Sequence, residues 1–273
     1  MDAHKNGKRR SVTLNRALYV ITLGSFILSV IYVSLRAIFD PWYREVTEYK
    51  IMIFQSLFGI LVVNLPSILE RRFMWRIPAG FSAAFTLFLF AAIFLGEAGD
   101  FYYRIPIWDD LLHLSSSMML GLLGFSLIDI LNNRKTHTSL SLSPFFVSLF
   151  SVTFALLFGV LWEIYEFSFD GILGLNMQKF MEMSEGGALV ELAGRAALAD
   201  TMRDLITDLV GAVLVSIFGY ISLKRGKGWL EAFKVEIDGA ESADKTDTIL
   251  KDKQKIKNKG PKKRNKTGRR RHP

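Results

Sequence analysis

The chain has 273 residues, half of them hydrophobic, with 22 Phe, no Cys and a net charge of +8. Its apolar residues come in blocks of about twenty, the length that crosses the roughly 30 Å hydrocarbon core of a bilayer, so a soluble enzyme, a secreted disulfide scaffold and a transcription factor are excluded. The positive charge belongs to residues 224–273, which hold 17 Lys+Arg and 7 Asp+Glu, whereas residues 1–223 hold 17 and 19.

Six apolar segments are each long enough to cross a bilayer as a helix. Only helices and closed barrels satisfy every backbone polar group in lipid, and the sequence has no run of ten-residue segments with alternating polarity. We therefore expect an all-α protein, a bundle of six transmembrane helices. The predicted spans are approximately Ala17–Phe39, Ile51–Leu69, Ile77–Leu95, Leu111–Leu131, Pro144–Tyr165 and Leu205–Leu223.

Lys and Arg indicate which side of the membrane each connection faces. Cations gather in the N-terminal segment, in the C-terminal tail, in the second connection (Arg71, Arg72 and Arg76) and in the fourth (Arg134 and Lys135). The other connections are acidic or mixed. Because every even connection is cationic, we expect a multi-pass protein of the cell membrane with both termini in the cytoplasm.

These boundaries divide the chain into three predicted parts. Residues 1–16 are a basic cytoplasmic N-terminus, residues 17–223 are the membrane domain, and residues 224–273 are a basic cytoplasmic tail. We expect the tail to be largely disordered, because a Lys-rich polar segment cannot bury enough apolar surface to fold alone. Beneath a membrane such a tail is expected to contact anionic lipids, and we expect no specific nucleic-acid partner.

The connection between the fifth and sixth spans, residues 167–203, is too long for a turn. Within it, Ala188–Ala199 places Glu191 and Arg195 four residues apart among apolar neighbours. This spacing predicts a short helix that lies at the outer membrane interface.

Ionisable residues border or enter three of the predicted spans, and helical spacing puts each set on one helix face. The topology, deduced from Lys and Arg alone, places all three sets at the same, extracytoplasmic side. The sets are Asp109, Asp110 and His113 at the start of the fourth span, Glu163, Glu166 and Asp170 at the end of the fifth, and Asp200, Asp204 and Asp208 at the start of the sixth. Three of these, Asp109, Asp170 and Asp200, are expected to be solvated at the level of the headgroups.

Several carboxylates in one membrane pocket repel each other, and each costs about 2.5–3.5 kcal/mol when it lies at the bilayer centre. Shared protons, pairing with Arg104 or Arg203, or a bound cation would relieve this cost. Oxygen ligands suit Mg²⁺, Ca²⁺ or Mn²⁺, and one His also admits Zn²⁺ or iron, so we expect a divalent cation. The candidate metal ligands are Asp110, His113, Glu163, Glu166, Asp204 and Asp208, and the candidate catalytic residues are His113 and Glu163.

Three motifs, W-D-D-L-L-H, W-E-I-Y-E-F and D-T-M-R-D-L-I-T-D-L-V-G-A, together resemble the YjdF-like family of bacterial inner-membrane proteins and, more distantly, VanZ-like proteins. The resemblance covers about residues 75–223. Its matching positions are Asp110 and His113, Glu163 and Glu166, then Asp204, Asp208 and Gly211, with Asn176 and Gln178 between them. The resemblance implies a bacterial cell-membrane protein and supplies no reaction.

Three functions are compatible with this pattern. The first is a metal-dependent enzyme that acts on lipid or envelope head groups at the outer leaflet. The second is an ion-coupled transporter, which is disfavoured because the acidic residues lie toward one side only. The third is a non-catalytic membrane scaffold, whose polar residues fix the packing of the helices.

Overall fold

The computed structural model describes residues 2–39, 46–133, 142–184, 189–226, 233 and 235–237. The connection that contains Arg134 and Lys135, and residues 238–273 of the tail that we predict to be disordered, lie outside the described residues. The elements are α1 (Asp2–Phe39), α2 (Val46–Val62), α3 (Leu65–Phe73), β1 (Trp75–Arg76), α4 (Ala79–Leu89), the π-helix η1 (Phe90–Ala98), α5 (Phe101–Arg104), α6 (Trp108–Asn133), α7 (Pro144–Leu173), β2 (Met181–Met183), β3 (Leu189–Glu191), α8 (Ala199–Arg225) and β4 (Glu236–Ile237).

Six helical stretches of the described residues are long and apolar enough to cross a membrane. This confirms the predicted all-α, six-span fold. The stretches are Thr13–Phe39, Tyr49–Phe73, Ala79–Ala98, Trp108–Leu131, Pro144–Leu173 and Ala199–Arg225. The last three extend past the predicted spans at their acidic ends, because a helix continues through polar residues that are paired or buried against neighbouring helices. The acidic residues that hydropathy placed at span borders therefore lie within helices.

The second span is predicted to be one continuous helix, but in the structure it breaks between α2 and α3. Pro66, at the start of α3, has no N–H to donate, and residues 63–64 form a turn. The side chain of Asn64 replaces the missing helical contacts: its Nδ2 donates to the Ile60 carbonyl at 2.7 Å and its Oδ1 accepts from the Tyr19 hydroxyl at 2.9 Å. The break is thus satisfied by hydrogen bonds in a place where water is excluded.

The third span changes from α-helix to π-helix at Phe90 and ends at Gly99. Asp100 follows with a φ of 59°, in the left-handed region, and reverses the chain into the short helix α5. π-Helical segments are rare and often occur at functional sites. Here the segment leads directly into the turn that precedes α5, and α5 is followed by α6.

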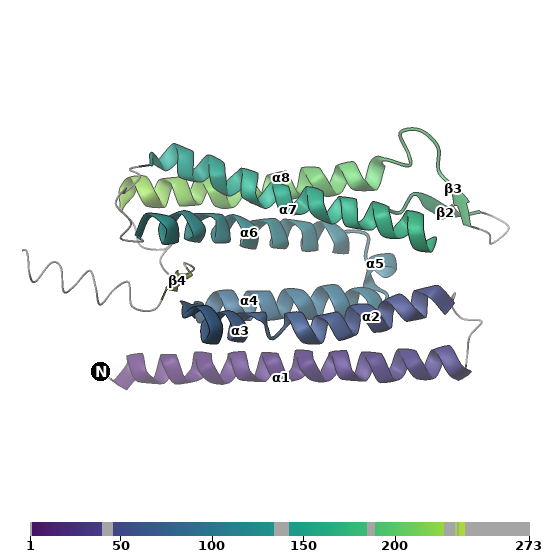
Figure 1. Cartoon of the computed structure of the whole chain (residues 1–273), viewed down its shortest axis with the longest axis horizontal. Coiled ribbons are helices and arrows are strands. Elements are labelled where there is room, and N and C mark those ends of the chain that lie inside the picture. Colours follow the sequence, from purple (N-terminus) through teal and green to yellow (C-terminus); the bar gives the residue numbers. More distant parts are fainter. Residues whose placement is uncertain are drawn as a thin grey trace, which may run out of the picture.

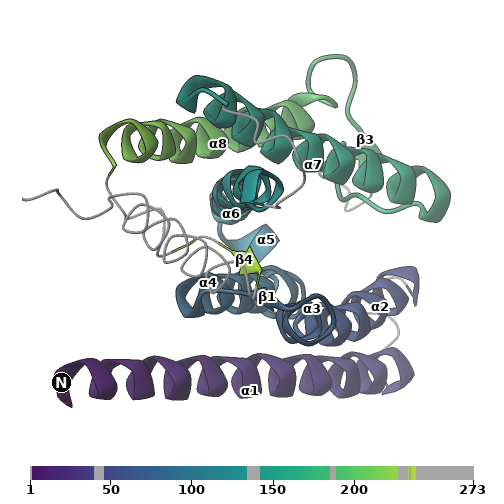
Figure 2. The same cartoon turned by 60° about the vertical axis from the view of Figure 1, so that its left-hand side comes forward.

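The spanning helices form two groups (Figure 1). α6, α7 and α8 lie together in one, α1 to α4 lie in the other, and α5 connects them. In both views α1 is the helix furthest from α7 and α8 (Figures 1 and 2). The chain alternates in direction, so the start of α6, the end of α7 and the start of α8 share one end of the molecule with β2 and β3 (Figure 1). The opposite end holds the N-terminus and the short β1–β4 pair.

Small residues let α6, α7 and α8 approach closely. Ser151 of α7 donates a hydrogen bond to the carbonyl of Gly121 in α6, at 2.7 Å. Ser216 of α8 donates to the carbonyl of Ser148 in α7, at 2.8 Å. A Cβ added at Gly211 would lie 2.6 Å from the Leu114 carbonyl oxygen, so α6 and α8 touch there through backbone. Such small-residue contacts are the usual means of helix association in lipid.

The predicted helix at Ala188–Ala199 is wrong for the described residues 189–198. Leu189–Glu191 is a strand that pairs antiparallel with Met181–Met183. Residues 194–198 form turns, in which Gly194 has a left-handed φ of 60°, and the helix α8 begins only at Ala199. Pairing with β2 satisfies the backbone of this segment and outcompetes a helix too short to be stable alone.

Candidate functional site

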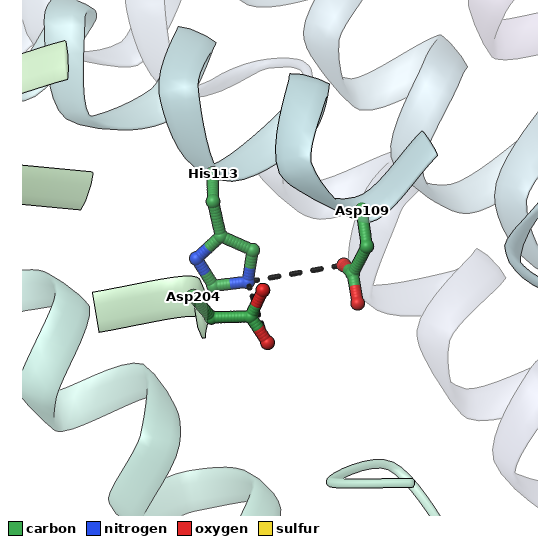
Figure 3. A group of neighbouring side chains, drawn as sticks. All are labelled: Asp109, His113 and Asp204. Atoms are coloured by element: carbon green, nitrogen blue, oxygen red, sulfur yellow. Dashed lines mark ion pairs between the residues drawn. The ribbon is translucent and has the colours of Figure 1, made fainter. Parts of the chain in front are cut away.

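His113 lies at the centre of a buried polar group that we call the His113 cluster: Asp109 and His113 of α6 with Asp204 and Asp208 of α8. The imidazole Nδ1 is 3.3 Å from Asp208 Oδ1. Its Nε2 is 3.8 Å from Asp109 Oδ1 and 4.0 Å from Asp204 Oδ2 (Figure 3). Each helix supplies two side chains four residues apart, because residues at that spacing share a helix face.

The close packing of the three helices places the cluster. Next to the cluster, Gly211 brings the backbone of α8 against Leu114 of α6. On the side of α7, Gly159 leaves the space that the Asp208 carboxylate occupies, with Asp208 Cγ 3.1 Å from where a Cβ would be. A side chain at Gly159 would therefore displace the Asp208 carboxylate, and one at Gly211 would push α6 and α8 apart.

α7 adds two buried glutamates to the same region. Glu163 lies beside the hydrogen-bonded side chains of Gln178 and Thr201, and within electrostatic range of His113. Glu166 accepts a hydrogen bond from Trp162 Nε1 at 3.0 Å and lies within electrostatic range of Glu163. The structure thus brings Glu163 and Glu166 near the His113 cluster.

Several buried carboxylate oxygens have no hydrogen-bond partner among the described residues. They are Oδ2 of Asp204, Oδ2 of Asp208 and both carboxylate oxygens of Glu163. These three side chains are 5% exposed or less. A buried charged group without a partner is costly, and it is normally neutralised by a proton or paired with a cation. The oxygens are therefore candidate cation ligands.

Lys179 is a member of the site that the sequence analysis did not identify. Its ammonium forms ion pairs with Asp109 of α6 and with Asp200 of α8, the latter at 3.0 Å. Burial alone would lower the pKa of Lys179, but the attraction of the two carboxylates outweighs burial and raises the pKa above its ordinary value. Lys179 is therefore a fixed positive charge. No local motif marks it, because its partners are 70 and 21 residues away.

A folded loop holds Lys179 in place. Asp170 accepts hydrogen bonds from the backbone N–H groups of Met177 and Gln178, at 2.7 and 2.9 Å. Asn176 pairs with the backbone of Met181 through both its side-chain oxygen and nitrogen. Asp170 is 5% exposed, so its expected position among solvated headgroups is wrong: it anchors the loop.

Asp110 is placed away from His113. Its carboxylate forms an ion pair with Arg203, whose side chain is 57% exposed. Asp109, one position earlier and four before His113, faces the cluster instead. The sequence suggests Arg203 and Arg104 as partners of the acidic residues. Arg203 does pair with Asp110, whereas Arg104 pairs with Asp100, four residues before it.

Tyr102 lies near the site on α5, the short helix that connects the two groups. Its ring packs on Gly96, and its hydroxyl lies within electrostatic range of Asp109, Glu166 and Asp204. Burial, and then the charge of these carboxylates and Glu97, raises the pKa of Tyr102 well above its ordinary value. Tyr102 is therefore a neutral phenol. No sequence pattern marks Tyr102, because a Tyr next to a span is expected at any membrane interface.

The donor set of the His113 cluster fits a divalent metal ion. Among the described residues, ligand atoms of Asp109, His113 and Asp204 all lie within 4.8 Å of one another. One imidazole nitrogen and two carboxylate oxygens suit Mn²⁺, Zn²⁺ or iron. Asp208 on the other ring nitrogen is the carboxylate that commonly orients a metal-binding His. With Nδ1–H donated to Asp208, the Nε2 lone pair points to the two remaining carboxylates.

The chain belongs to the family described as "Predicted membrane protein (DUF2238)", which matches residues 11–225. It is also similar to a Thermotoga maritima protein named only "Uncharacterized protein", with 27% identity over 161 residues, or 57% of this chain and 69% of that one. No solved structure matches the chain. The family and the six apolar helices make this a multi-pass membrane protein in contact with the lipid bilayer.

Proposed function

We propose that this member of the DUF2238 family is a metal-dependent enzyme that acts on lipid or envelope head groups at the outer side of the bacterial cell membrane. The observation that carries the proposal is the arrangement around His113: two carboxylates face its Nε2 and a third holds its Nδ1. Asp204 and Asp208, both buried, each keep one oxygen without a partner.

Each residue has a distinct role in this proposal. Asp109, His113 and Asp204 would hold the ion, and Asp208 would orient the imidazole. A bound divalent ion would supply a polarised substrate oxygen or an activated water. Glu163, buried near His113 and beside Thr201 and Gln178, is the group available to hold or release a proton. His113 then serves as a ligand rather than as a general base.

The location of the site supports a head-group substrate. The cluster lies at one end of three spanning helices, which is where a membrane places the polar part of its lipids. The Lys and Arg pattern puts this end outside the cell and both termini in the cytoplasm, with the basic tail on anionic lipids of the inner leaflet. The resemblance to YjdF-like and VanZ-like proteins supports a bacterial cell-membrane location.

Metal analysis of detergent-purified protein tests the site. We expect about one divalent ion per chain in the wild type and none in His113→Ala. Asp110→Asn is the matched control, because it removes a carboxylate from the same helix turn but outside the cluster. Metal loss without loss of thermal stability would support a binding site. A wild type without metal, together with strong destabilisation by His113→Ala, would support the scaffold function instead.

A second assay separates an enzyme from a transporter. The metal-loaded protein is incubated with bacterial lipid extract, and mass spectrometry follows the loss or exchange of head groups. If the protein is an enzyme, we expect turnover in the wild type that disappears in His113→Ala and in Glu163→Gln. Turnover absent from both forms, with metal-ion or proton flux across reconstituted vesicles, would favour the transporter.

The orientation has its own test. The chain contains no Cys, so a single one can be introduced at Glu182, an exposed residue of β2 at the same end as the cluster. A membrane-impermeant maleimide should label Glu182→Cys in intact cells. Labelling only after lysis would place the cluster on the cytoplasmic side.

A further inference from the structure

Asp109 presents its two oxygens to two different cation positions. Oδ1 faces His113 Nε2 at 3.8 Å, on the side of the proposed metal. Oδ2 contacts the ammonium of Lys179 on the other side. That ammonium also lies 3.0 and 3.3 Å from the two oxygens of Asp200. A positive charge therefore already sits where one oxygen of Asp109 and both oxygens of Asp200 converge.

This arrangement matches a two-metal site in which one metal is replaced by a side chain. In two-metal enzymes the ions lie about 3.5–4 Å apart and share ligands. A carboxylate whose two oxygens point to two positions is the ligand such a site needs. We propose that the Lys179 ammonium occupies the second metal position, so that the protein takes one divalent ion where its carboxylates alone would hold two. This inference rests on the proposed function.

Hydrogen bonds of the loop hold the ammonium in this position. Asp170 and Asn176 fold residues 174–181, and the Gln178 side chain ties the loop to Thr201 of α8. Lys179 itself adopts a left-handed backbone φ of 46°, which residues other than Gly rarely adopt. The fold thus holds Lys179 in a strained conformation directly over Asp109 and Asp200.

The charges around the site indicate what removal of Lys179 would leave. The Arg203 guanidinium is already paired with Asp110, away from the cluster. Without the ammonium, Asp109 Oδ2 and both Asp200 oxygens lose their paired cation. Oxygen ligands in this number suit Mn²⁺ or Mg²⁺, which keep water in the remaining positions.

The test counts bound Mn²⁺ in the full-length protein by equilibrium dialysis and records its electron paramagnetic resonance spectrum. We expect one Mn²⁺ per chain in the wild type, with an isolated-ion spectrum. Lys179→Met should bind two, with the exchange-coupled spectrum of two ions that share a carboxylate. Lys179→Arg keeps the charge and should remain at one. Arg203→Met removes a cation at the same end but outside the cluster, and should also remain at one.

Each outcome decides between the two proposals. A wild type that binds no Mn²⁺ and also holds no other divalent ion in the metal analysis overturns the proposed function itself. One uncoupled Mn²⁺ in both wild type and Lys179→Met leaves the proposed function standing and overturns the inference about Lys179. If Lys179→Met folds only with Mn²⁺ present, bound Mn²⁺ is counted in the protein folded with Mn²⁺. One ion there overturns the inference and two ions support it. The double variant Lys179→Met/Asp200→Asn should return to one ion, and two ions there would also overturn the inference.

Discussion

Gly159 offers a direct measure of how tightly the site is packed. The Asp208 carboxylate lies against this glycine, with Asp208 Cγ only 3.1 Å from where a Cβ would be, whereas carbon atoms normally pack about 3.5–4.0 Å apart. In Gly159→Ala, α7 must therefore move away from α8, or Asp208 must rotate away from His113. Asp208 is 2% exposed, so it has no solvent to move into. Overpacking of this kind costs about 1–3 kcal/mol.

Gly171→Ala is the matched control on the same helix. A Cβ at Gly171 meets nothing within 4 Å, so the change should be neutral or, through helix propensity, stabilising by up to about 1 kcal/mol. Reversible unfolding in bicelles measures both variants. Metal titration should show a loss of affinity of about 10-fold to 100-fold in Gly159→Ala alone, as when the carboxylate behind a metal-binding His is lost. Equal stability and equal metal affinity of the two variants would refute the packing described here.

Three further predictions concern the loop and the helix contacts. Asp170→Ala leaves two backbone N–H groups without an acceptor, at about 1–3 kcal/mol each, and hydrogen exchange at Met177 and Gln178 should accelerate; unchanged exchange would contradict the anchoring role. Ser151→Ala removes one interhelical hydrogen bond and should cost about 0.6 kcal/mol in bicelle unfolding, so a loss above about 2 kcal/mol would show a larger role. The third prediction concerns Lys179, whose pKa in the folded protein is raised above its ordinary value of about 10.4. The stability that the charged Lys179 adds is therefore complete below that ordinary pKa and declines only at higher pH. The difference in melting temperature between wild type and Lys179→Met should stay constant from about pH 7 to about pH 9.

Hydropathy predicted the spans because the length of an apolar helix is fixed by the thickness of the bilayer. It failed where local hydrogen bonding overrides composition. At Asn64 and Pro66 the apolar run continues but the helix breaks, since proline cannot donate. The helix at Ala188–Ala199 was predicted from the spacing of Glu191 and Arg195 instead, and there the pairing of Leu189–Glu191 with β2 forms a strand, although the residues themselves are compatible with a helix.

The candidate site was only partly visible in the sequence. Spacing on single helices predicted that His113 shares a face with nearby acids and that Asp204 and Asp208 share another, because these relations depend on helix geometry alone. The sequence analysis names Asp110 as the ligand and leaves Asp109 among the headgroups, but which of the two meets His113 depends on the rotation of α6 against α8. The structure turns Asp109 to His113 and Asp110 to Arg203.

Hydrophobicity and helical periodicity are enough to predict the six membrane crossings and the gathering of acidic residues at one end of three helices. Which of those residues meet depends on how the helices pack against one another. Lys179 reaches Asp109 of the His113 cluster from a loop distant in the chain, through an ion pair that no local pattern encodes. Gly159 and Gly211 set the distance between the helices, and that distance brings separate carboxylates close enough to share a cation.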